Sequence, residues 1–148
     1  MTGFWVALVT LALGSLIGVV RLRRDGRVRD ISDSTGSGDS GDGAHRLSAA
    51  DLGDELGERA TLVQFSTAFC QPCRATRRIL ADVSAIVPGV RHVEVDAESR
   101  LDLVRRLDIM RTPTVLVLDP SGNIVKRASG QPRKAEVLAA LADAVPGT

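Results

Sequence analysis

The chain has 148 residues, a formal net charge of +1 and only two cysteines. This length allows one folded domain and a smaller additional segment, and the near-neutral charge gives no electrostatic reason to expect nucleic acid as a partner. Two cysteines are too few for a scaffold held by several disulfides. Any stable disulfide within the chain must therefore join Cys70 to Cys73.

An apolar segment without charged residues runs from Gly3 to Val20. As a helix it would be about 27 Å long, which approaches the hydrocarbon thickness of a bilayer. One alternative is a buried core helix, but the segment has no polar stripe. The other is a cleavable signal peptide, which normally has basic residues before its apolar run and not after it. We therefore predict an uncleaved transmembrane helix over residues 3–22.

Five arginines follow the apolar segment, at positions 21, 23, 24, 27 and 29. Basic residues beside a membrane helix mark its cytoplasmic end, so we predict an N-terminus outside the cell membrane and a folded domain in the cytoplasm. The opposite placement, with the domain outside the cytoplasm, is the alternative. Gly14 and Gly18 form one Gly-x-x-x-Gly pair, which predicts a monomer or a weak dimer through this helix.

Residues 23–43 are expected to be a basic juxtamembrane segment and a flexible linker. From Ser32 to Gly43 every residue is Ser, Asp, Gly or Thr, and such a stretch cannot bury enough apolar surface to fold. Residues 44–148 then form the folded domain.

Short apolar and amphipathic segments after residue 44 predict alternating helices and strands. Ser48 is suited to cap a helix that runs to about Leu56. Strands are expected at residues 61–65, 90–95, 114–118 and 124–128, and helices at 72–87, at 99–107 and after Pro132. Turn residues 119–123 would join the last two strands as an antiparallel hairpin. This order predicts an α/β fold with a mixed sheet between helices.

Cys70 and Cys73 enclose Gln71-Pro72 just after a strand-like apolar run. This spacing at a strand-to-helix junction brings the two sulfurs within bonding range, and the start of the helix stabilises the thiolate of the first cysteine. The pattern predicts dithiol–disulfide exchange, in which one thiolate attacks a disulfide and a second thiol resolves the mixed disulfide.

The segment Phe69-Cys70-Gln71-Pro72-Cys73, with Thr112-Pro113-Thr114 and Gly130, resembles the thioredoxin family over about residues 44–145. The resemblance implies a thioredoxin-like three-layer α/β/α fold and a thiol–disulfide oxidoreductase that reduces protein disulfides. It further implies no cofactor other than the Cys70–Cys73 disulfide. No metal is expected either, because the two cysteines, His45 and His92 lack the paired spacing of a zinc site. The implied partners are protein disulfide substrates and an electron donor such as a thioredoxin reductase.

The resemblance also implies a role for each matching residue. Cys70 would be the nucleophile and Cys73 the resolving thiol, and Pro113, if cis, would present the backbone of Thr112 to an extended substrate. Phe69 stands where the family usually has tryptophan, and Gln71 where it usually has glycine. The expected substrate groove consists of Phe69, Gln71, Pro72, Thr112, Pro113 and Gly130.

Two residues behind the cysteines depart from the family pattern. Gln64 stands where thioredoxins carry a buried aspartate that helps proton transfer at the resolving cysteine, and an amide cannot act as a general base. His92 falls where the family often has a lysine near that aspartate. We therefore expect Cys73 to lose its proton by another route.

Three arginines, Arg74, Arg77 and Arg78, share one face of the helix after Cys73. They either stabilise the Cys70 thiolate at longer range or form a solvated surface.

For the function of the whole domain, three alternatives to a cytoplasmic reductase remain. The first two are an extracytoplasmic protein for cytochrome maturation and one for disulfide formation, and the third is a non-catalytic binding module with the same fold.

Overall fold

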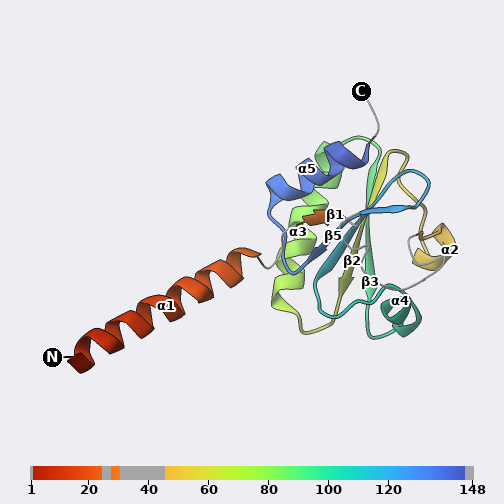
Figure 1. The fold of residues 1–148 in the computed structure, drawn as a ribbon. Coiled ribbons are helices and arrows are strands. Elements are labelled where there is room, and N and C mark those ends of the chain that lie inside the picture. The colour runs from red at the N-terminus through yellow and green to blue at the C-terminus, as the bar shows by residue number, and fades with distance from the viewer. Residues whose placement is uncertain (1, 25–27, 31–45, 146–148) are drawn as a thin grey trace.

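The computed structural model describes residues 2–24, 28–30 and 46–145, and these residues form a five-stranded mixed sheet with helices on both faces (Figure 1). The strand order is β1-β5-β4-β2-β3. The strands are β1 (Val28–Asp30), β2 (Ala60–Ser66), β3 (Val90–Asp96), β4 (Thr114–Leu118) and β5 (Ile124–Ser129). The helices are α1 (Thr2–Arg24), α2 (Ala49–Leu52), α3 (Gln71–Ile86), α4 (Leu101–Arg106) and α5 (Lys134–Ala144).

The central strand β2 is parallel to β3 and antiparallel to β4. All seven residues of β2 are buried, which requires apolar contacts on both faces of the sheet. β4 and β5 form the predicted antiparallel hairpin, with Thr114 opposite Ser129. The prediction of an α/β fold with a mixed sheet is therefore confirmed.

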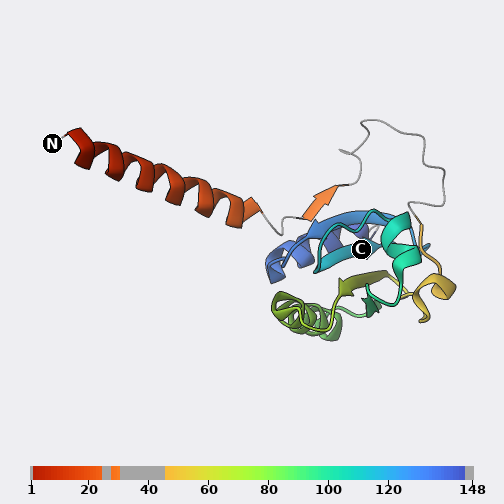
Figure 2. The same cartoon turned by 90° about the horizontal axis from the view of Figure 1, so that it is seen from below.

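Each face of the sheet has its own apolar core. On one face, α3 and α5 pack against a cluster that includes Leu62, Leu80 and Val137. On the other face, α2 and α4 cover a cluster that includes Phe65 and Leu103, and Figure 2 shows the two layers edge-on. Because β2 lies between these layers, its C-terminal end is held rigidly, and the cysteines follow directly after it.

The structure places the elements of this domain close to the predicted residues. The largest difference is α2, which was expected to reach Leu56 and instead ends at Leu52. Gly53 follows with φ 68°, a left-handed conformation that ends the helix and that glycine adopts without strain.

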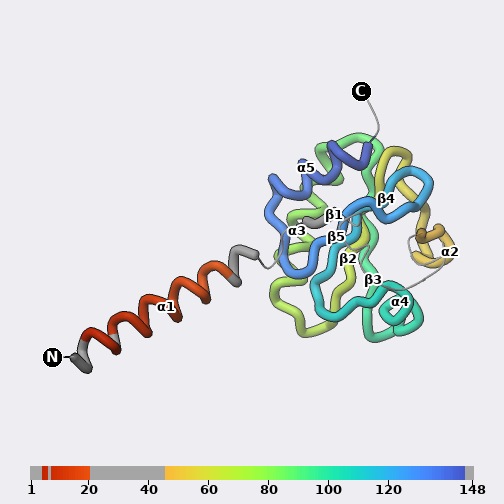
Figure 3. The backbone as a smooth tube through the Cα atoms, viewed as in Figure 1, coloured from red at the N-terminus to blue at the C-terminus, as the bar shows by residue number. Residues whose placement is uncertain are grey.

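The N-terminal apolar segment is helical as α1, and the trace in Figure 3 shows it leading away from the sheet. Within the described residues, no helix combines the length and the apolar character needed to cross a membrane. The membrane span over residues 3–22 stays a prediction.

The strand at residues 28–30, within the predicted basic juxtamembrane segment, was not predicted. These residues form β1 and pair antiparallel with β5, with Val28 opposite Ala128. Three residues are too few to show a strand periodicity, and the pairing depends on the free edge of β5, which no local pattern reveals. The Ser/Gly/Asp stretch from Ser32 to Gly43 lies outside the described residues.

Candidate active site

Cys70 and Cys73 form a disulfide at the start of α3, with 5.2 Å between their Cα atoms. Cys70 is the N-cap residue, and its Sγ accepts a hydrogen bond of 3.2 Å from the backbone N–H of Cys73. Pro72 occupies the first turn, where its missing N–H removes no helical hydrogen bond. Cys73 faces the core and is 1% exposed, whereas Cys70 is only partly buried.

The loop before the cysteines contacts a second loop that is distant in the sequence. The Thr112–Pro113 peptide bond is cis, and Pro113 is buried. Thr67 Oγ1 lies 3.5 Å from Thr112 Oγ1. The Pro113 carbonyl accepts a hydrogen bond of 2.8 Å from Gly130, whose φ of 96° favours glycine at this position. The structure thus brings the cysteine loop, the predicted Thr112-Pro113 segment and Gly130 into one connected region.

Exposed side chains surround this region. Phe69 is 94% exposed, and Gln71 and Pro72 are exposed in the first turn of α3. Met110, three residues before Pro113, is 82% exposed and was not predicted as a site residue. Its only signal in the sequence is an unbranched apolar residue in the loop just before the Thr-Pro motif. Exposed apolar side chains beside a reactive disulfide provide a surface for another polypeptide.

Gln64 lies directly behind the disulfide and is 0% exposed. Its amide Nε2 donates a hydrogen bond of 2.8 Å to the Cys73 carbonyl. A carbonyl can only accept, so this contact fixes the amide with its nitrogen on the Cys73 carbonyl and its oxygen away from that carbonyl. The structure thus places the Gln64 amide against the backbone of Cys73.

A charged network lies next to Gln64 on β3 and was not predicted as a unit. Glu94 Oε1 accepts hydrogen bonds from Ser66 Oγ at 2.5 Å and from Arg77 Nη2 at 2.6 Å. Partial burial opposes ionisation of Glu94, but the contacts with Arg77 and Ser66 outweigh it and lower the pKa of the carboxyl group. Glu94 is therefore an anion near neutral pH.

His92 occupies the next position toward the start of β3 on the same face of the sheet. Burial lowers the pKa of its imidazole below the ordinary value of 6.5; the nearby Glu94 opposes this effect and Arg77 adds to it. His92 is thus neutral at pH 7 and can accept a proton.

The three arginines after Cys73 have different roles. Arg74, Arg77 and Arg78 are all exposed, as the solvated-surface alternative expects. Arg77, however, forms an ion pair with Glu94 across to β3. Its charge is therefore directed to the network behind Cys73. In the described part of the chain, no three His, Cys, Asp or Glu side chains group in a way that could hold a metal ion.

The fold and the cysteine pair agree with the comparisons to known proteins. The thioredoxin family profile matches residues 46–144. Thioredoxin H4-1 from Oryza sativa subsp. japonica is 27% identical over 100 residues, which cover 67% of this chain and 73% of that protein. Thioredoxin H5 from the same plant is 29% identical over 72 residues, so this chain spans about half (53%) of its length.

Among solved structures, the thioredoxin from Fasciola hepatica superposes with a TM-score of 0.53 at 20% identity. The match covers 60% of this chain and 83% of that one. At this identity the similarity shows the fold alone. The family profile establishes that the chain belongs to the thioredoxin family. Proteins of this family use a redox-active disulfide as the active site and need no cofactor, and in this chain Cys70 and Cys73 form a redox-type Cys-x-x-Cys pair at disulfide distance.

Proposed function

We propose that this protein reduces disulfides in other proteins, with Cys70 as the nucleophile and Cys73 as the resolving thiol. The observation that carries the proposal is the different exposure of two bonded sulfurs. Cys70 lies at the surface end of α3, while Cys73 is 1% exposed. A substrate disulfide can reach the first sulfur, and only an intramolecular attack can involve the second.

The reaction begins from the dithiol form. The Cys70 thiolate attacks one sulfur of the substrate disulfide, which forms a mixed disulfide and releases the other substrate sulfur as a thiolate. Cys73 then loses its proton and attacks Cys70 Sγ. The Cys70–Cys73 disulfide forms and the second substrate thiolate leaves, so the substrate gains two electrons and the protein loses two.

The start of α3 favours Cys70 as the attacking group. The N–H of Cys73 points at Cys70 Sγ, and the positive end of the helix dipole lies there as well. Both contacts stabilise a thiolate more than a thiol, so they lower the pKa of the free Cys70 thiol in the dithiol form.

The proposed substrate groove consists of the residues that surround the disulfide. The cis bond turns the Thr112-Pro113 segment, and its contacts with Thr67 and Gly130 hold it in place. The Thr112 backbone would pair with an extended substrate segment on one side of the disulfide, and Phe69 would cover an apolar side chain. Gln71, Pro72 and Gly130 complete the groove.

An enzymatic test separates reduction from simple binding. Reduced full-length protein is mixed with insulin, and disulfide reduction is followed in the presence of dithiothreitol. We expect turnover by the wild type and none by Cys70→Ser. Cys73→Ser should accumulate a mixed disulfide with the substrate that is visible by mass spectrometry. Wild-type turnover equal to that of Cys70→Ser would refute the proposal and favour a non-catalytic binding module.

The cellular setting is a separate proposal. We propose a cytoplasmic domain tethered to the membrane, reduced by a donor such as a thioredoxin reductase, because a cytoplasmic dithiol is kept reduced. The support is the uncharged run Gly3–Val20 followed by arginines in the sequence. Membrane fractionation tests the tether, and reporters fused after Thr148 that work only inside or only outside the cytoplasm test the orientation. Recovery in the soluble fraction, or activity of the outside reporter alone, would refute this setting.

A further inference from the structure

Two buried polar atoms on β2 and β3, one of them on the residue that contacts the Cys73 backbone, have no hydrogen-bond partner. Among the described residues, Gln64 Oε1 and His92 Nε2 are the buried side-chain polar atoms in this condition. A buried polar atom without a partner costs about 1–3 kcal/mol, so two of them call for an explanation. The amide of Gln64 cannot flip to give its oxygen another position, because its nitrogen donates to the Cys73 carbonyl and an oxygen there could not.

The register of β2 and β3 places these two residues side by side. His92 lies opposite Leu62, and Gln64 lies opposite Glu94. Because alternate residues of a strand share a face, His92 and Gln64 are diagonal neighbours beneath α3. One water molecule between these neighbouring side chains would give both atoms a partner, and a buried water is stable where polar groups surround it.

The groups that face His92 from the elements packed around it are few. β3 contributes Glu94, and α3 contributes Arg77; the charges of both act on the imidazole. β2 contributes Leu62, Gln64 and Ser66, none of which titrates in the physiological range. Asp96 at the far end of β3 is exposed, and its Oδ1 accepts a hydrogen bond from the Glu98 N–H.

Resolution of a mixed disulfide requires the buried Cys73 thiol to lose a proton. At 1% exposure, Cys73 has little direct contact with bulk water. Glu94 is a poor acceptor, because Arg77 and Ser66 already occupy its Oε1 and stabilise its charged form. His92 is neutral at pH 7 and its Nε2 is uncommitted, so it is the suitable base in this layer.

We propose that His92 accepts the proton of Cys73 during the resolving step, through water held between Gln64 Oε1 and His92 Nε2. The proton leaves Cys73 Sγ, which becomes a thiolate, and the imidazole becomes an imidazolium. The thiolate attacks Cys70 Sγ, the bond between Cys70 and the substrate sulfur breaks, and the substrate departs as a thiolate. His92 then returns its proton to solvent. His92 is a positioning residue in this step because it acts through water. The inference rests on the proposed roles of Cys70 and Cys73.

The first test isolates resolution from protein substrates. Reduced protein is mixed in a stopped-flow instrument with an aromatic disulfide that releases a coloured thiolate. Attack by Cys70 releases the first thiolate, and attack by Cys73 releases the second, so the slower phase reports resolution. In the wild type the rate of this phase should rise with pH through an inflection below 6.5, the ordinary imidazole pKa. His92→Gln should lose this inflection and slow the phase by about 100-fold at pH 7, the low end of a general-base contribution.

Two variants make the test specific. His45→Gln removes the only other histidine of the chain and should keep the wild-type profile. Gln64→Asp combined with His92→Gln supplies a carboxylate on the neighbouring strand and should restore a fast phase with a different inflection. A profile for His92→Gln equal to that of the wild type would overturn the inference, because the proton would then leave by another route.

A second measurement uses the unaltered protein and does not depend on the folding of a variant. The imidazole of His92 is titrated by NMR in the dithiol and disulfide forms, with its signal assigned from the spectrum of His45→Gln. If His92 and the Cys73 thiol exchange a proton, their titrations are coupled, and the His92 pKa should differ between the two forms. Equal His92 pKa values in both forms would overturn the inference. Failure to reduce insulin with an intact His92-dependent profile would instead refute the proposed function alone.

Discussion

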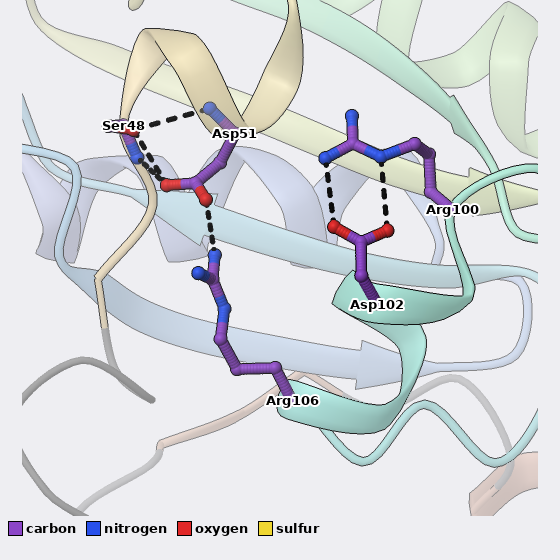
Figure 4. Close-up of polar contacts among 5 residues, drawn as sticks. All are labelled: Ser48, Asp51, Arg100, Asp102 and Arg106. Carbon is purple, nitrogen blue, oxygen red and sulfur yellow. Dashed lines mark hydrogen bonds and ion pairs between the residues drawn. The ribbon is translucent and has the colours of Figure 1, made fainter.

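The contact between α2 and α4 depends on one carboxylate, Asp51. Ser48 caps α2, and Asp51 Oδ2 accepts hydrogen bonds from the Ser48 backbone N–H at 2.8 Å and from its hydroxyl at 2.7 Å (Figure 4). Asp51 Oδ1 accepts a further bond of 2.7 Å from Arg106 on α4. The hydrogen bonds from Ser48, and then the charge and hydrogen bond of Arg106, lower the pKa of Asp51 from 3.8 to about 2. We expect Asp51→Asn to destabilise the fold in a pH-dependent way.

The size of this effect follows from the two pKa values. A carboxyl group with a pKa of 3.8 in the unfolded chain and about 2 in the folded one contributes at most about 2.4 kcal/mol above pH 5. The side chains of Arg106 and Asp51 are 39% and 24% exposed, so water screens the interaction, and about 1 kcal/mol is a better expectation. For a domain of this size, that lowers Tm by about 4–8 °C.

The pH dependence has a defined sign. The folded pKa is depressed, so the contribution of Asp51 is complete above the unfolded value of 3.8 and is lost as the pH falls toward 2. We expect urea unfolding of the oxidised protein to show the largest difference in the free energy of unfolding between wild type and Asp51→Asn at neutral pH. Near pH 3 this difference should be about half as large. Asp102→Asn removes a carboxylate that pairs with Arg100 but is 66% exposed, so it serves as the control. The reasoning would be refuted if Asp51→Asn lowered the free energy of unfolding no more than Asp102→Asn does, or by an amount that does not depend on pH.

Three further substitutions test the core, a tight turn and the charge network. Leu80→Ala removes a side chain on the buried face of α3 that is 0% exposed, and it should lower the free energy of unfolding in urea by about 2–5 kcal/mol. Gly122→Ala should lower Tm markedly, because φ is 85° there and a Cβ would lie 2.1 Å from the Leu47 carbonyl oxygen. Glu94→Gln removes the charge that raises the His92 pKa, so an NMR titration should find that pKa lower than in the wild type.

Each of these substitutions has a matched control or a contradicting result. Leu101 is 50% exposed, and Leu101→Ala should change stability by no more than about 0.5 kcal/mol. Gly53 has a similar positive φ but nothing within 4 Å of its Cβ position, so Gly53→Ala should destabilise less than Gly122→Ala. Equal losses in either pair would contradict the packing argument. An unchanged or raised His92 pKa in Glu94→Gln would contradict the electrostatic one.

Most elements of the folded domain could be predicted because local patterns encode them. Ser48 has the side chain of a helix cap, the run Thr61–Phe65 has the composition of a buried strand, and Asp119 to Asn123 has turn chemistry. The short strand β1 could not be predicted, because three residues carry no periodicity and their partner on β5 lies about a hundred residues away in the chain.

The residues of the candidate site also fall into those that the sequence identifies and those that it does not. The cysteine pair and the Thr112-Pro113 segment are short motifs of consecutive residues, so the sequence alone identifies them. The network of Ser66, Arg77 and Glu94 joins three elements, and each of its residues has an ordinary surface interpretation when read alone. Charge pairing between distant elements leaves no local pattern.

The sequence by itself therefore determined the reaction class. The two cysteines and their spacing at the start of a helix can be read from a few consecutive residues. Gln64 can be read in the same way, and its amide cannot titrate. Only the tertiary structure decided what surrounds the buried sulfur. It placed Gln64 Nε2 on the Cys73 carbonyl, left Gln64 Oε1 and His92 Nε2 without partners, and committed Glu94 to Arg77. Proton affinity in a core depends on burial and on neighbours from other elements, and the packing of β2, β3 and α3 creates both.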